Sequence, residues 1–254
     1  MDFMKAINIT GPVAALFAAI GLIGGIVVAN ASGDPSQPAV APAPTLRDYA
    51  VPVTLHHLHA TVEHVSANMD VLSKIGPGFA EGYQVDSASY DFTAPDRLEM
   101  HAKAGLLSAT QIYTNTTRQT DFGWIHRTDD ISKDITKRQT IEVLGMLPEN
   151  YIDIMRSDYV GIDTINGVAC DVFMLRYISD LPTDNRRFET WVSKDDHYIV
   201  KQRVWDGGNH EHQTVFYKNP VQILPGVWVP TRVEAYDAAG ELGGVCTQKN
   251  ISAD

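Results

Sequence analysis

Hydrophobic residues recur at alternating steps of three and four positions between residues 55 and 75. This spacing predicts one apolar stripe along an α-helix, formed by Leu55, Leu58, Val62, Val65, Met69, Leu72 and Ile75. Thr54 is a favourable N-cap residue for it. The run Gly76-Pro77-Gly78 ends the helix, because glycine suits the position after a helix and proline cannot continue one. A helix with such a stripe must cover a sheet or a second helix.

From Tyr83 onward the apolar period becomes two, which is typical of strands with one buried face. Leu98, Met100 and Ala102, for example, alternate with charged or polar neighbours. Asn166-Gly167 is a hairpin signal, because both residues tolerate positive φ. Further strands are predicted at 168–177, 188–192, 198–205, 212–217, 227–236 and 242–251, with turns at 194–197, 206–209 and 237–240. Short turns favour antiparallel pairing of neighbouring strands.

Residues 137–157 are the other helical candidate, and Pro148 divides them into two short pieces. The elements together predict a mostly β protein with helices (α+β). Its core is a single large curved antiparallel sheet with helices on the concave face, because a sheet of this size tends to curl. If the helices do not fill the concavity, a cavity remains, and apolar cavities with a few polar groups are the usual ligand sites.

The first 45 residues differ from the rest in composition. Lys5 precedes an almost wholly apolar run at 12–29, and Ala29-Asn30-Ala31 is a pattern that signal peptidase accepts. Residues 1–31 are therefore expected to be a secretory signal cleaved after Ala31, with an uncleaved inner-membrane anchor as the alternative. Residues 32–45 form a Pro/Ala-rich linker. The remaining stretch, 46–254, is the folded domain, and either interpretation places it outside the cytoplasm.

The net charge and the cysteines narrow the possible partners. A formal charge of −11 argues against nucleic acid, which requires a basic face, and against tight docking on anionic lipid. Cys170 and Cys246 are the two cysteines of the chain. They would form a disulfide in an oxidising compartment if their positions allowed it, or serve as small buried hydrophobes. The sequence leaves both open.

Motifs for catalysis are absent from the sequence, which has no GxSxG, no P-loop and no GxGxxG after a strand. Asp129-Asp130 and Asp195-Asp196 occur in predicted turns, where aspartate is favoured for backbone reasons. The histidines do not form a closed zinc set, so exposed positions on solvated surfaces are expected for His56, His59, His64, His210 and His212. We therefore expect no catalytic residues, no bound metal and no cofactor.

Five features, in this order, carry a family resemblance. They are the opening helix, the strand at 92–100 (FTAPDRLEM), the Asp121-Phe122-Gly123-Trp124 turn, the Ile165-Asn166-Gly167 hairpin and the closing hairpin from Pro230 to Gly240. Together they resemble the outer-membrane lipoprotein-sorting family, whose best-known member is the periplasmic carrier LolA. The resemblance implies an unclosed antiparallel half-barrel with helices as a lid over lipoprotein acyl chains. Ala94 stands where the carrier has an arginine that helps to hold the lid closed.

The resemblance also implies that Leu98 and Met100 face an acyl-binding cavity. The residues expected to bind lipid, partly as aromatic lining of that cavity, are Phe92, Leu98, Met100, Trp124, Phe173 and Leu175. The expected partners are lipoprotein acyl chains or other lipids, together with membrane-bound donor or acceptor proteins, and a monomer in the periplasm or cell envelope is expected.

The leading hypothesis is thus an exported protein that holds acyl chains by burial, since each buried CH₂ contributes about 0.8 kcal/mol. The alternatives are an envelope-stress sensor of the same fold, a structural envelope protein with a filled core, and an enzyme with a non-standard site.

Overall fold

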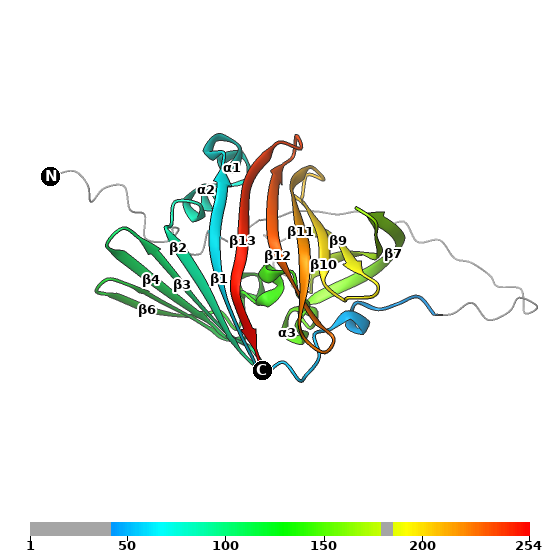
Figure 1. The fold of residues 1–254 in the computed structure, drawn as a ribbon, viewed down its shortest axis with the longest axis horizontal. Helices are drawn as coiled ribbons and strands as arrows, with labels where there is room; N and C mark the ends of the chain where they lie inside the picture. Colours follow the sequence, from blue (N-terminus) through cyan, green and yellow to red (C-terminus); the bar gives the residue numbers. More distant parts are fainter. Residues whose placement is uncertain (1–41, 179–184) are drawn as a thin grey trace, which may run out of the picture.

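The protein is built around one antiparallel sheet, seen in a computed structural model that describes residues 42–178 and 185–254 (Figure 1). Over these residues the sheet has 13 strands in the order β6-β5-β4-β3-β2-β1-β13-β12-β11-β10-β9-β8-β7. The expected signal and most of the expected linker lie outside the described residues. Along residues 42–178 and 185–254, no helix combines the length and the apolar character that crossing a membrane requires.

The first half of the sheet is formed by β1 (His57–Ala67), β2 (Ser87–Thr93), β3 (Arg97–Ala104), β4 (Leu107–Tyr113), β5 (Thr117–Phe122) and β6 (Ile125–Asp130). The second half is formed by β7 (Met155–Ile165), β8 (Val168–Tyr177), β9 (Arg187–Ser193), β10 (Ile199–Trp205), β11 (Glu211–Leu224), β12 (Val227–Asp237) and β13 (Leu242–Ala253). The helical elements are η3 (Leu46–Tyr49), α1 (Met69–Ile75), α2 (Pro77–Gly82), η4 (Ile135–Lys137), η5 (Ile141–Leu144) and α3 (Glu149–Ile152).

The chain enters the sheet at its centre, at β1, and ends there as well, because the last strand, β13, lies beside β1. From β1 each strand pairs with the next until β6, and from β7 each strand again pairs with the next until β13, which pairs with β1. The two edge strands, β6 and β7, are therefore consecutive in sequence but lie at opposite ends of the sheet. Residues 131–154, here called the crossing segment, join them and carry η4, η5 and α3. The predicted fold class, a single open antiparallel sheet with helices on its concave face, is confirmed.

The predicted helix over residues 55–75 is wrong for its first two thirds. Residues 57–67 form β1, and only α1, at 69–75, is helical. Asn68 rather than Thr54 is the N-cap residue, and its side chain accepts a hydrogen bond from the Val71 amide. The apolar residues of this stretch fit a period of two as well as the helical period, since Leu58, Ala60 and Val62 are all buried.

Two physical reasons favour the strand. Thr61, Val62 and Val65 are β-branched and fit a pleated surface. Residues 57–62 also pair with β2 and residues 58–67 with β13, and this pairing satisfies their backbone groups. The end of the helix at Gly76 is confirmed, although Pro77 opens the short helix α2 instead of ending all helical structure.

The later strands agree with the sequence pattern. β8 has the predicted bounds, and the Asn166-Gly167 turn joins it to β7 with positive φ at both residues. The turns at 194–197, 206–209 and 237–240 each separate two paired strands. Pro148 separates η5 from α3, as expected for two short pieces, but the second ends at Ile152 and β7 begins at Met155. The small length of these pieces leaves part of the concave face uncovered.

A buried carboxylate fastens the segment before β1 to the sheet. Asp171 on β8 accepts hydrogen bonds from the hydroxyls of Tyr49 and Tyr159, the latter at 2.9 Å. It also pairs with Lys194 Nζ at 2.9 Å. Burial opposes ionisation of Asp171, but the bonds from Tyr49, Lys194 and Tyr159 outweigh burial and keep its pKa below the ordinary value. Tyr49 thereby holds η3 against the concave side of β8.

Candidate functional site: a cavity under the crossing segment

A cavity of about 300 Å³ lies between the concave face of the sheet and the crossing segment. The sheet supplies side chains from both halves, among them Val62 and Tyr90 on one side and Val215 and Val233 on the other. The crossing segment supplies residues 136–140 together with Glu142, Val143, Leu144, Tyr151 and Ile154, and α2 supplies Phe79. The volume is at the lower end of the range for small-molecule sites.

The crossing segment is held in place by backbone hydrogen bonds to the rest of the domain. The Ile199 amide on β10 donates to the Gly145 carbonyl at 2.8 Å, and the Val51 amide donates to the Leu147 carbonyl at 2.9 Å. Its apolar side chains pack against the concave face of the sheet in two groups. Ile141, Leu144 and Met146 belong to the cluster over the first half of the sheet. The segment therefore rests on the sheet on both sides of the cavity.

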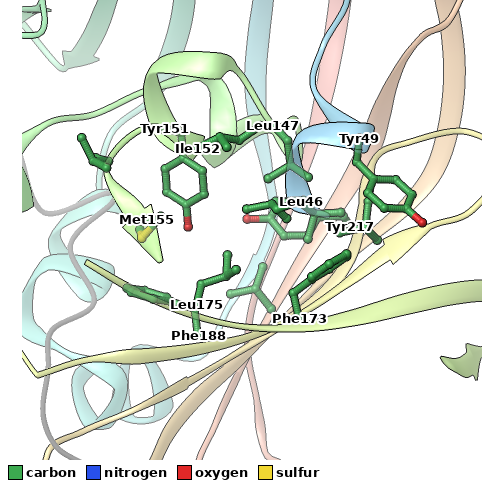
Figure 2. Packing of buried hydrophobic residues seen from close by; sticks show 14 of the residues in the cluster. Leu46, Tyr49, Leu147, Tyr151, Ile152, Met155, Phe173, Leu175, Phe188 and Tyr217 are labelled. Atoms are coloured by element: carbon green, nitrogen blue, oxygen red, sulfur yellow. The ribbon is translucent and has the colours of Figure 1, made fainter. Parts of the chain in front are cut away.

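Figure 2 shows the cluster over the second half of the sheet. Leu147, Tyr151 and Ile152 of the crossing segment pack in it with Phe173 and Leu175 of β8 and Phe188 of β9. Leu46 and Tyr49 of η3 belong to the same cluster. Burial of such side chains stabilises by roughly 1.5–3 kcal/mol each. This cluster fixes the end of the crossing segment that leads into β7.

The floor of the cavity is unexpectedly polar. Gln202 of β10, Gln213 of β11 and Gln248 of β13 all line it and are all buried. Above them, Glu142 of η5 accepts a hydrogen bond from Gln202 Nε2 at 3.0 Å. Burial raises the pKa of Glu142 to about 7, while the bond from Gln202 and the charge of Arg186 act in the opposite direction. The site thus combines apolar walls with buried amides, and its lining also contains basic side chains such as Arg186.

The six residues expected to bind lipid do not line this cavity. Phe92, Leu98 and Met100 point to the concave face, but they are buried in the cluster that contains Ile141, Leu144 and Met146. Phe173 and Leu175 occupy the same position in the second cluster, together with Leu147 and Tyr151. Five of the six residues therefore lie in the clusters that the crossing segment covers, rather than in open space.

Trp124, the sixth residue, is far from any interior position. It lies in the turn between β5 and β6, and 83% of its surface is exposed. The ladder between β4 and β5 pairs Ala109 with Phe122, so its continuation places Trp124 beside Leu107 at the end of the sheet. Leu106 and Leu107, in the neighbouring turn, are exposed as well.

Sequence reasoning missed the glutamines of the floor. Gln213, Val215 and Tyr217 are two residues apart along β11 and all point to its inward face. Gln213 therefore occupies a core position in the period-two pattern. A glutamine at such a position is the signal that was available, because buried amides need hydrogen-bond partners. Glu142 gave no comparable signal, since its stretch has no regular period.

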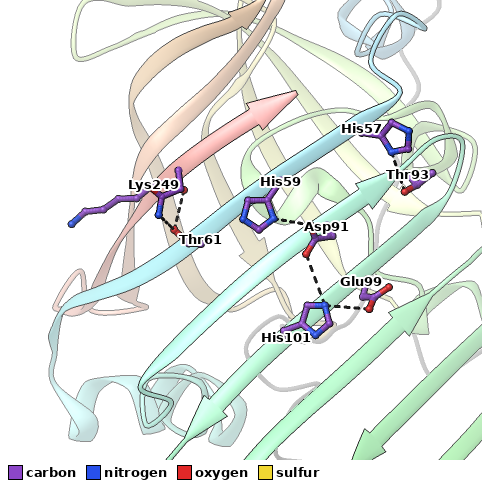
Figure 3. A network of polar contacts seen from close by, with 9 residues as sticks. His57, His59, Thr61, Asp91, Thr93, Glu99, His101 and Lys249 are labelled. Atoms are coloured by element: carbon purple, nitrogen blue, oxygen red, sulfur yellow. Dashed lines mark hydrogen bonds and ion pairs between the residues drawn. The ribbon is translucent and has the colours of Figure 1, made fainter. Parts of the chain in front are cut away.

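The convex face carries a polar network across three strands, shown in Figure 3. Asp91 of β2 contacts His59 of β1 at 2.6 Å, and His101 of β3 contacts Glu99 at 3.1 Å. These side chains alternate with the buried residues of the same strands and are partly open to solvent. Among the described residues, no group of three or more potential ligands is arranged to hold a metal ion. His56 lies just before β1 and His59 belongs to it, rather than to the predicted helix.

Both cysteines are free thiols. Cys170 lies on β8 and Cys246 on β13, five positions apart in the strand order. Neighbouring strands are about 4.8 Å apart, so roughly 24 Å of sheet separates them, well beyond the reach of a disulfide. The structure therefore excludes the disulfide between Cys170 and Cys246 that the sequence left open. Cys246 lines the cavity, and burial raises its thiol pKa to about 11.

No protein-family model matches the sequence, and a search of curated proteins also gave no match. Solved structures do resemble the fold. A LolA superfamily protein from Nitrosomonas europaea has a TM-score of 0.54 and 14% sequence identity, over 84% of this chain and 94% of that one. An outer-membrane lipoprotein-sorting protein domain from Vibrio parahaemolyticus has a TM-score of 0.49 and 9% identity, over 82% and 89% of the two chains. The chain thus has the fold of the LolA superfamily protein.

Proposed function

We propose that the protein is an exported lipid-binding protein that holds an acyl chain on the concave face of its sheet. The observation that carries the proposal is the cavity between the sheet and the crossing segment, with apolar walls from Val62, Val215 and Val233. Holding by burial requires no catalytic group, metal or cofactor, because removing each CH₂ from water contributes about 0.8 kcal/mol. The likeness in fold to a LolA superfamily protein supports the same function.

The crossing segment acts as the cover of the site in this proposal. A volume of about 300 Å³ suits one short chain and not the several chains of a lipoprotein. If the crossing segment lifts, Leu98 and Met100 on one side and Phe173 and Leu175 on the other lose their cover and join the cavity wall. These residues then bind lipid only in the open form. Transfer of lipid between donor and acceptor proteins also requires the open form.

The experiment that tests this function fills the cavity from one wall. Val233→Trp places an indole in the space that the cavity occupies, so binding of N-phenyl-1-naphthylamine, a neutral apolar fluorophore, should fall at least tenfold. Val221→Trp, on the exposed part of β11, is the matched control and should bind as the unmodified protein does. Equal binding by both variants, or no binding by the unmodified protein, contradicts the proposal.

A second measurement identifies the natural occupant. Protein isolated from the cell envelope should carry a co-purified lipid that mass spectrometry detects, and Val233→Trp should carry less of it. A known lipid-binding protein isolated by the same route is the positive control. If the control carries lipid and this protein carries none, the result counts against a holding role.

A further inference from the structure

The cavity lining has the opposite charge to the chain as a whole. The chain carries a formal charge of −11. Among the described residues, the lining contains one acidic side chain, Glu142, and four basic ones, which are Arg118, Lys137, Arg138 and Arg186. Arginine and lysine are almost never fully buried unless they are paired. The groups that neutralise these four side chains therefore decide what the cavity can hold.

Two of the basic residues have acidic partners outside the lining. Arg118 of β5 pairs with Asp129 of β6 at 2.7 Å, and Lys137 of η4 pairs with Asp134 at 2.8 Å. Neither aspartate lines the cavity. The positive charge of these two side chains is therefore balanced before any ligand enters.

Arg186, the third basic residue, is 7% exposed and lies over the rings of Tyr177 and Phe188. It also acts on Glu142. Burial raises the pKa of this carboxyl group, and the charge of Arg186 is one of the influences that oppose the shift. The acidic residue of the lining therefore lies within electrostatic reach of Arg186, and Arg186 does not depend on a ligand for a partner.

Arg138 is the basic residue of the lining that has no partner. It follows η4, is half-buried and lines the cavity. Its Nε atom is buried and donates no hydrogen bond, and no carboxylate in the part of the chain that the structure describes forms an ion pair with it. A guanidinium group does not lose its proton in a protein, so only a hydrogen-bond acceptor satisfies this N–H group. An acceptor that enters the cavity would meet it.

The size and the walls of the cavity narrow the class of acceptor. Its volume of about 300 Å³ suits one short chain, and Val62, Val215 and Val233 provide apolar walls. A carboxylate is a small planar anion that accepts two parallel hydrogen bonds from a guanidinium group. We infer that the cavity takes a single-chain fatty acid, whose carboxylate pairs with Arg138 while its chain lies along the apolar walls. This inference rests on the proposed function and adds the class of ligand.

Three ligands with the same ten-carbon chain test the inference by displacing N-phenyl-1-naphthylamine from the full-length protein. The titration is run at pH 6, where decanoate is anionic, methyl decanoate is neutral and decylamine is cationic. At this pH Glu142, with a pKa of about 7, is mostly neutral. We expect decanoate to bind at least tenfold more tightly than either of the other two. Acetate, which has the carboxylate without the chain, should not displace the fluorophore.

Two variants connect the preference to Arg138. In Arg138→Gln the advantage of decanoate over methyl decanoate should shrink to less than about threefold, while N-phenyl-1-naphthylamine still binds. Lys133→Gln is the matched control, because it removes the same charge from the crossing segment at an exposed position outside the lining. It should keep the full advantage. If Arg138→Gln does not fold, as judged by circular dichroism, Arg138→Lys keeps the charge but loses the planar fork and should reduce the advantage at least twofold.

The outcomes separate the two proposals. Equal binding of decanoate and methyl decanoate, tighter binding of decylamine, displacement by acetate, or a preference that survives in the Arg138 variants overturns the inference and leaves acyl binding intact. A preference that Lys133→Gln also removes would show a general effect of charge and would overturn the role of Arg138. Failure of all three ten-carbon ligands and of the fluorophore to bind overturns the proposed function itself.

Discussion

Gln202 donates a hydrogen bond from Nε2 to Glu142 Oε1 at 3.0 Å, and this contact joins β10 to the crossing segment. It lies in the cavity lining, where Gln202 is buried and Glu142 is half-buried. A protonated carboxyl group accepts this bond without bringing a charge into the interior. The raised pKa of Glu142 therefore couples the seating of the crossing segment to pH.

Glu142 should make stability fall as the pH rises. Its pKa is about 7 in the folded protein, against 4.5 for an ordinary glutamate. Between these values the unfolded chain has lost the proton and the folded protein retains it, so unfolding releases a proton and becomes easier with rising pH. The loss is at most about 3 kcal/mol, and it is complete above pH 7. Urea unfolding at pH 5 and pH 8 measures it.

Glu142→Gln is the control, since glutamine keeps the hydrogen bond but does not titrate. Other groups also titrate in this window, so the informative quantity is the difference in unfolding free energy between the two proteins. That difference should change with pH in favour of Glu142→Gln as the pH rises. A difference that stays constant from pH 5 to pH 8 would show that Glu142 titrates normally.

Gly145→Ala should loosen the crossing segment. Gly145 has φ of 81°, and a Cβ atom there would lie 2.7 Å from Pro230 Cγ and 2.8 Å from Tyr217 Cδ1. Gly240→Ala is the matched control, because Gly240 has φ of 78° and open space around it. The left-handed backbone costs both variants about 1–2 kcal/mol, and the close contacts should cost Gly145→Ala about 1–3 kcal/mol more. Unfolding free energies of equal size in the two variants would refute the close packing.

Val62→Ala and Val65→Ala distinguish a strand from a helix at β1. Val62 is 5% exposed and Val65 is 56% exposed, although both belong to the apolar stripe of a helix. Removing the two buried methyl groups of Val62 should cost about 1.5–3 kcal/mol, and the change at Val65 should stay within about 0.5 kcal/mol. Urea denaturation gives both values. Similar costs at the two positions would favour the helical interpretation.

The same stretch shows where sequence reasoning reached its limit. Leu58, Val62 and Val65 fit the helical period, and Leu58, Ala60 and Val62 fit the strand period, so local pattern could not decide. Pairing with β13, which lies almost two hundred residues away in the sequence, selects the strand. Later strands were predicted well because period-two runs and turn residues such as Asn166-Gly167 are local signals.

The site was predicted less well than the fold. Alternation correctly placed Leu98 and Met100 on the inward face, but it carries no information on what covers them. Ile141, Leu144 and Met146 fill that space from a stretch without regular period. Trp124 was expected near lipid on resemblance, and its exposed place at a turn follows from the register of β5 and β6 instead.

Cys246 offers a direct probe of the cavity. With a thiol pKa of about 11, roughly 0.1% of Cys246 is thiolate at pH 8, against about a quarter of a free cysteine. In a Cys170→Ser background, N-ethylmaleimide should label Cys246 about 100-fold more slowly than it labels free cysteine. An acyl ligand in the cavity should slow the reaction further. Labelling as fast as that of free cysteine would mean that the site is open to solvent.

The strand order has a mechanical consequence for the crossing segment. Because β6 and β7 form opposite edges of the sheet, residues 131–154 are anchored at both ends, one end to each edge. A cover attached in this way has no free end to swing aside. Its slack depends on the distance between the two edges, so flattening the sheet stretches it and tighter curling relaxes it. Any partner that grips the two edges would thereby control access to the cavity without touching the cavity itself.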